Sequence, residues 1–228
     1  MKRFSVGFAL VLGLSASTAS AFWNKNGNGS VETRSFHLSG FNQVEVDGEA
    51  SLVIRVGEPS VTVALDSNLF EYVDVGVTDG RLEVKTSWRI KPTSRPQVVV
   101  TLPTVKNISL SGNVDTQVTL GSSDKVLALE TNGFSHVHVT NTQLDRLVIA
   151  ANGGSTIEVK GRVQELGLET TGNFLGEFGD LDVERVKVDG SGSTKLEFDK
   201  VGSISGSLSG LNAVTYKVPP KHSTLKTK

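Results

Sequence analysis

Apolar and polar residues alternate over most of the chain from Phe41 onward. Alternation with a period of two places every second side chain on the same face of a β-strand. A longer pattern overlies it, in which a Gly is followed four and six residues later by residues predicted to point inward. The pattern occurs at Gly112, Gly133, Gly153, Gly172, Gly192 and Gly210, which lie 21, 20, 19, 20 and 18 residues apart.

This near-constant spacing is typical of a solenoid whose units stack on their neighbours. Each unit has room for two or three short strands, and no segment shows the apolar period of 3.6 residues that indicates a helix. The sequence therefore predicts an all-β fold, a parallel β-helix-like solenoid of about seven coils, with the segment after Gly48 as the seventh copy. A β-sandwich is the alternative, since it also contains short strands at regular spacing.

Two local signals refine this prediction. The residue before each repeated Gly is small and polar, which predicts a ladder of side chains in stacked coils; these residues are Ser111, Asn132, Asn152, Thr171, Ser191 and Ser209. In the N-terminal part, Asp79-Gly80 separates two alternating segments and predicts a β-hairpin. We expect this hairpin region to cap one end of the solenoid.

The ends of the chain differ from its middle. Residues 1–21 combine a basic start, an apolar run and a small-x-small ending, which predicts a cleaved signal peptide. Residues 22–34 are rich in Asn and Gly and are expected to be a flexible leader. Residues 35–218 then form a single β-domain, and residues 219–228, which begin with two prolines, are expected to be a disordered tail. No second apolar segment long enough to span a membrane follows the signal peptide.

Composition excludes several classes of function. The chain has no Cys, so disulfides, thiolate chemistry and a Cys-containing zinc site are excluded. Its formal net charge is −1, which gives no electrostatic argument for nucleic-acid binding. No motif predicts a cofactor, a metal site or a catalytic nucleophile.

Five segments resemble one family of bacterial proteins. They read FNQVEVDGEASLVIRVGE, VDVGVTDGRLEVKT, VVVTLPTVKNISLSGNVDTQV, DGSGST and LSGLNAVTY, in that order. The chain from about Ser35 to Tyr216 resembles the putative auto-transporter adhesin head domain, also called the GIN domain. The resemblance implies a right-handed β-helix-like domain, exported to the periplasm or surface of a Gram-negative bacterium, with an adhesive role. It implies no catalytic residues.

The fifth position after each Gly forms one predicted outward-facing stripe. The candidate ligand residues in it are His138, Glu158, Glu177 and Glu197. Stacked carboxylates repel one another unless a cation or a lysine intervenes. The stripe is therefore a candidate site for a divalent cation or a sugar, and the alternative is a solvated surface neutralised by Lys160 and Lys195.

A basic loop between Thr86 and Pro96 is the second candidate surface. Trp88, Arg89 and Arg95 in this loop are candidate partner contacts, because Trp and Arg are favoured anchors in protein interfaces. Alternatively, Trp88 covers the open end of the coil stack.

These observations predict an exported, non-enzymatic binding or adhesin-like domain of the cell envelope, with a glycan or a protein as its partner. A carbohydrate-active enzyme is the first alternative, since polysaccharide cleavage uses paired carboxylates. A structural or stress-related periplasmic protein is the second. We favour binding because no long insertion is present to wall a cleft and exclude water.

Overall fold

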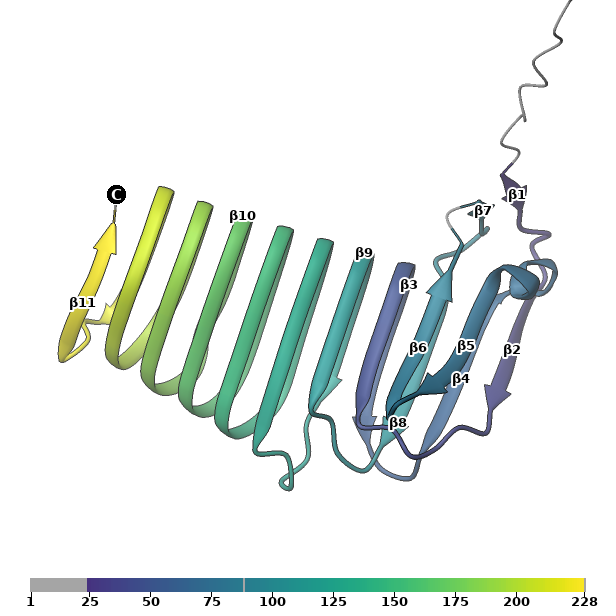
Figure 1. Ribbon diagram of the computed structural model, residues 1–228, viewed down its shortest axis with the longest axis horizontal. Helices are drawn as coiled ribbons and strands as arrows, with labels where there is room; N and C mark the ends of the chain where they lie inside the picture. The colour runs from purple at the N-terminus through teal and green to yellow at the C-terminus, as the bar shows by residue number, and fades with distance from the viewer. Residues whose placement is uncertain (1–23, 88, 228) are drawn as a thin grey trace, which may run out of the picture.

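Most of the described residues lie in β-strands (Figure 1). The computed structural model describes residues 24–87 and 89–227. Its elements are β1 (Lys25–Asn26), β2 (Val31–Phe36), β3 (Gln43–Val56), β4 (Ser60–Asp66), the 3-10 helix η1 (Ser67–Tyr72), β5 (Val73–Thr78), β6 (Arg81–Thr86), β7 (Ile90–Lys91), β8 (Gln97–Leu102), β9 (Asn107–Thr119), β10 (Val126–Val218) and β11 (His222–Thr227). The all-β prediction is confirmed. No helix within the described ranges is long and apolar enough to cross a membrane.

One open sheet contains most of the chain, with neighbours in the order β11-β10-β9-β3-β8-β4-β2. Strands β3, β9 and β10 pair in parallel, with Gly48 opposite Gly112 and Gly112 opposite Gly133. Strand β10 is 93 residues long and bends repeatedly, so that its successive passes lie side by side between β9 and β11 (Figure 1). Residues at the same place in the Gly pattern therefore stand next to one another.

The Gly residues form a column in which the backbones approach closely. Gly153 has a φ of 111°, and a Cβ atom built on it would lie 2.5 Å from the carbonyl oxygen of Gly133. Gly133 stands in the same relation to Gly112, also at 2.5 Å. Because no side chain fits there, each pass has a glycine at this point. The number of residues between successive glycines therefore reflects the length of one pass.

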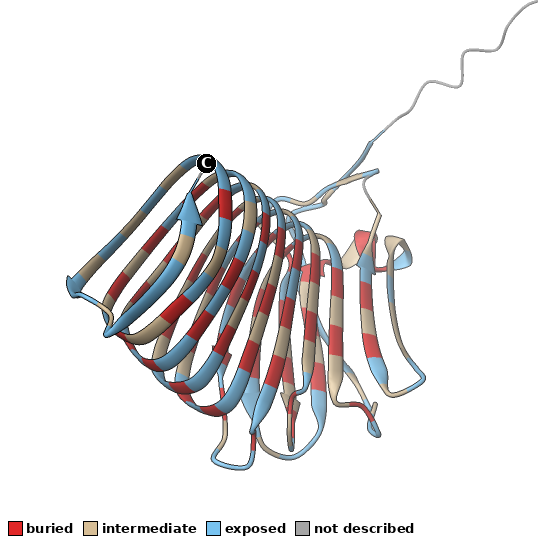
Figure 2. Cartoon of the chain, turned by 60° about the vertical axis from the view of Figure 1, so that its left-hand side comes forward, coloured by how far each residue is buried: buried red, intermediate tan, exposed pale blue. Residues whose placement is uncertain are grey.

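Burial follows the predicted alternation. At the fourth and sixth positions after Gly, the side chains of Val137, Val139, Ile157 and Val159 are fully buried. Figure 2 shows that buried bands recur from pass to pass. Tyr216, in the last pass of β10, is only partly buried, because β11 pairs with Ser203–Leu208 and no other described strand pairs with the segment that contains Tyr216.

The N-terminal region contains the predicted hairpin. Strands β5 and β6 pair antiparallel, and Asp79 and Gly80 between them have φ values of 50° and 75°. Two consecutive positive φ values define the tight turn that matches the twist of a hairpin, so this prediction is confirmed. Strand β4 pairs antiparallel with both β2 and β8, and β3 joins this region to the parallel passes.

The segment expected to be a flexible leader differs from the prediction. Strand β1 pairs with β7, and β2 begins at Val31 and pairs with β4 along its whole length. Gly29 N–H also donates a 2.7 Å hydrogen bond to the buried carboxylate of Asp66. Partners distant in sequence thus order residues whose own composition does not. The predicted signal peptide, residues 1–21, lies outside the described residues.

The C-terminal segment also differs from its prediction. After Pro219-Pro220 the chain resumes pairing, and β11 lies parallel to Ser203–Leu208 of β10. The Lys221 N–H donates a 3.1 Å hydrogen bond to the carbonyl of Gly202. The two prolines end one strand, because they lack donor N–H groups, but they do not prevent the next.

Candidate functional site

The predicted stripe places His138 beside Glu158 on adjacent passes of β10. His138 Nδ1 lies 2.6 Å from Glu158 Oε2, and Lys160 Nζ lies 2.9 Å from the other carboxylate oxygen. The Lys160 contact lowers the pKa of the Glu158 carboxyl most, burial opposes this, and the His138 contact lowers it further. Glu158 is therefore held as a carboxylate between two basic side chains.

The rest of the stripe is also interleaved with lysines. Lys195 Nζ lies 2.6 Å from Glu197 Oε1, and the pKa of Lys195 is raised chiefly by this hydrogen bond and in part by the charge of Glu177. Lys160 also approaches Asp180, at 3.4 Å. Lysines beside the stripe thus offset the charges of Glu158 and Glu197. Within the described ranges, no group of three His, Asp or Glu side chains is arranged to hold a metal ion.

We expect added calcium to leave the thermal stability unchanged, because a cation at Glu158 would have to displace both Lys160 and His138. The measurement is the unfolding temperature with and without about 5 mM CaCl₂, since any ligand that binds the folded state raises it. NaCl at equal ionic strength is the control. A calcium-specific rise of several degrees that Glu158→Gln abolishes would establish the stripe as a cation site.

The basic loop lies beside the ordered N-terminal segment. Trp88 is outside the described residues. The carbonyl oxygen of Arg89 accepts a 2.7 Å hydrogen bond from the N–H of Lys25, and the Arg95 guanidinium lies 3.6 Å from Glu49 Oε1. The loop thus connects strand β1 to the first parallel pass.

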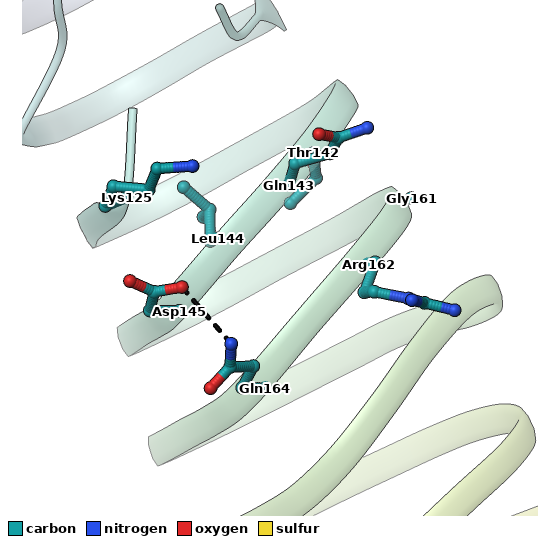
Figure 3. Close-up of a pocket in the computed structure, with 8 residues that line it drawn as sticks. All are labelled: Lys125, Thr142, Gln143, Leu144, Asp145, Gly161, Arg162 and Gln164. Carbon is teal, nitrogen blue, oxygen red and sulfur yellow. Dashed lines mark hydrogen bonds between the residues drawn. The ribbon is translucent and has the colours of Figure 1, made fainter. Parts of the chain in front are cut away.

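A polar corner cleft of about 440 Å³, which the sequence analysis missed, lies between consecutive passes of β10. Its lining includes Lys125, Thr142, Gln143, Asp145, Arg162 and Gln164 (Figure 3). Asp145 and Gln164 point toward one another, and Gln164 Nε2 donates a 3.3 Å hydrogen bond to Asp145 Oδ1. The buried Oγ1 of Thr142 has no hydrogen-bond partner among the described residues. The cleft offers donors and acceptors of several kinds to a polar ligand.

A second concave surface lies along the Gly column, and we call it the Phe134 groove. It has a volume of about 410 Å³ and is lined by Phe134, Asn113, Glu49, Ile90 and Pro92, together with backbone of the Gly column. Ile90 and Pro92 belong to the basic loop, so the groove adjoins the candidate contact that the sequence predicts. Phe134 is the signal that sequence reasoning overlooked, because it is an aromatic residue at a predicted outward position.

Comparison with known protein families identifies the chain. The family described as putative auto-transporter adhesin, head GIN domain, matches residues 40–220. The chain belongs to this family. The match spans β3 to β10, including the hairpin, and ends at Pro220.

Solved structures share the fold of this GIN-domain chain. A putative adhesin from Bacteroides fragilis is 17% identical, with a TM-score of 0.78, and the match covers 89% of this chain and 95% of that one. A putative adhesin from Parabacteroides merdae is 20% identical, with a TM-score of 0.56 and coverage of 90% and 99%. A putative lipid binding protein from Parabacteroides distasonis is 15% identical, with a TM-score of 0.61 and coverage of 90% and 99%. No functionally curated protein matches.

Proposed function

We propose that this GIN-domain chain is an exported, non-enzymatic binding protein that presents its β-surface to a glycan or a protein at the cell envelope. Membership of an adhesin-like family supports the proposal. The polar corner cleft is the observation that carries it, because the cleft offers a carboxylate and two amides from the paired strand β10 and an ammonium from Lys125, whose carbonyl accepts a hydrogen bond from Asp145 N–H. Such mixed polar groups can orient a hydroxylated or peptide ligand.

We also propose an architecture for the domain and a route of export for the chain. We take the parallel passes to be a right-handed solenoid of about seven coils with the hairpin region as its cap, and residues 1–21 to be a signal peptide that directs the chain to the periplasm or surface. The parallel register of β3, β9 and β10 supports the solenoid. A rigid stack of this kind holds side chains on different passes at constant spacing, which suits an extended partner.

Binding can be tested with the purified chain on a glycan array and on immobilised envelope proteins. We expect binding to a subset of the glycans or of the envelope proteins. Lys125→Ala should lower the affinity about fivefold or more, because it removes an ammonium that would donate a charge-assisted hydrogen bond to the ligand. Lys200→Ala is the matched control, since Lys200 is an exposed lysine like Lys125 but lies outside the cleft. Both variants should unfold at the temperature of the unmodified chain.

Two outcomes would contradict the proposal. If neither surface retains the chain, a structural role is favoured over binding. If the chain releases reducing ends from polysaccharides and Glu158→Gln or Glu177→Gln abolishes that turnover, the chain is a carbohydrate-active enzyme.

A further inference from the structure

Phe134 is an aromatic platform that the fold exposes to solvent. The residue is 72% exposed, although it lies in the middle of the stack. A Cβ atom on Gly154, the residue at the same place in the next pass, would lie 2.7 Å from the Phe134 ring. The ring therefore lies over a glycine, and that glycine does not have a positive φ. The absence of a side chain at position 154 leaves the space that the ring occupies.

Polar side chains continue the same row. Glu49 is opposite Asn113 in the pairing of β3 with β9, and Asn113 is opposite Phe134 in the pairing of β9 with β10. All three follow a Gly of the column and line the same groove. Adjacent strands lie about 4.8 Å apart, so the row from carboxylate through amide to aromatic ring spans about 10 Å.

The charge of this row is balanced. The Arg95 guanidinium lies 3.6 Å from Glu49 Oε1 and offsets its negative charge. The groove wall adds the apolar Ile90 and Pro92 and the hydroxyl-bearing Thr86 and Ser87. The groove is thus mainly apolar with a few polar groups at its rim, as in most sites for small ligands.

We propose that the Phe134 groove binds a neutral pyranose ring of a glycan. The axial C–H groups on one face of the sugar would lie on the electron-rich face of the Phe134 ring. Adjacent hydroxyl groups would hydrogen-bond to the amide of Asn113 and the carboxylate of Glu49, which together offer both donors and acceptors. This inference rests on the proposed binding function and adds to the polar corner cleft a second, separate site with a stated ligand class.

The geometry favours a sugar over an apolar protein side chain or an acyl chain. An apolar ligand would take the amide and the carboxylate out of water without replacing their hydrogen bonds, which carries a free-energy cost. A sugar suits both parts of the row, because its apolar face can contact the Phe134 ring and its hydroxyl groups can hydrogen-bond to Asn113 and Glu49.

Saturation-transfer NMR can test the proposal on the purified chain, with the methyl pyranosides of glucose, galactose, mannose and N-acetylglucosamine as probes. We expect transfer to the protons on one ring face of at least one probe. Phe134→Ala should weaken its binding about tenfold, the effect of losing one aromatic contact. Phe134→Trp should retain binding, and Gly154→Ala should weaken it while keeping the aromatic residue, because the new methyl group displaces the ring.

Leu211→Ala is the matched control, because Leu211 follows Gly210 as Phe134 follows Gly133 and is 80% exposed. It should bind the probes as the unmodified chain does. If no probe shows transfer while Phe134→Ala reduces binding to an immobilised envelope protein, the groove is a protein-docking site and the sugar proposal is wrong. If no probe, glycan or envelope protein binds, both the sugar proposal and the proposed binding function are wrong.

Discussion

Gly153→Ala should destabilise the chain by about 4 kcal/mol, the sum of a strained backbone and a steric clash. The φ of 111° at Gly153 lies in a region that L-residues with a Cβ atom rarely adopt. The new Cβ would lie 2.5 Å from the Gly133 carbonyl oxygen and 3.1 Å from its nitrogen, so it meets backbone that cannot rotate away. Thermal unfolding measures the effect, and we expect a midpoint about 10 °C lower.

Gly76→Ala is the control for this substitution. Gly76 lies in β5, does not have a positive φ, and a Cβ atom built on it would meet nothing within 4 Å. This variant should be as stable as the unmodified chain or slightly more stable, because alanine has less conformational freedom in the unfolded state. If the two variants unfold at the same temperature, close approach within the Gly column is not what requires glycine at position 153.

The parallel core was predictable because one face of each strand is buried. A shift of one residue would expose Val137 and Val139 and bury their polar neighbours, so the apolar pattern specifies which residues face inward. The hairpin at Asp79-Gly80 was predictable for a local reason, since few residues other than Asp, Asn and Gly adopt its φ values. The strands β2 and β11 were not predictable, because each depends on a partner strand distant in sequence.

Some of the candidate sites could likewise be predicted from the sequence, and one could not. The adjacency of His138 and Glu158 follows from the Gly spacing alone, and the structure confirms that the two side chains meet. The position of Phe134 beside Gly154 could be predicted from the same spacing, because each of the two residues comes directly after a repeated Gly. The polar corner cleft does not follow from it, because it lies at a bend of β10 where the Gly pattern does not specify which side chains converge.

Asp66 is a second point on which the fold depends, and it explains why the N-terminal segment is ordered. Its side chain is fully buried at the end of β4. The Gly29 N–H donates to one carboxylate oxygen at 2.7 Å, Thr93 N–H donates to the other at 2.8 Å, and Thr93 Oγ1 donates at 2.8 Å. Burial alone would raise the pKa of Asp66, but these hydrogen bonds together lower it below 3.8. One carboxylate thus joins three segments of the chain.

Asp66→Ala should destabilise the chain by about 3 kcal/mol, because it leaves two backbone N–H groups without their charged acceptor. It should also make residues 24–36 sensitive to limited proteolysis, since the contact with Gly29 is lost. Asp74→Ala, at an exposed position of β5, is the control and should change neither property. Proteolysis at residues 24–36 as slow as in the unmodified chain would show that β2 is held by its pairing with β4 alone.

The same carboxylate predicts a dependence on pH. Because folding lowers the pKa of Asp66, its contribution is fully present above the unfolded value near 3.8 and is lost as the pH falls through the lower folded value. The stability difference between the unmodified chain and Asp66→Asn should therefore be constant at neutral pH and shrink below about pH 4. Urea unfolding of both chains over this range measures it, and the difference cancels contributions from other carboxylates. A difference that stays constant down to pH 2 would mean that Asp66 is not bound as a carboxylate in the folded chain.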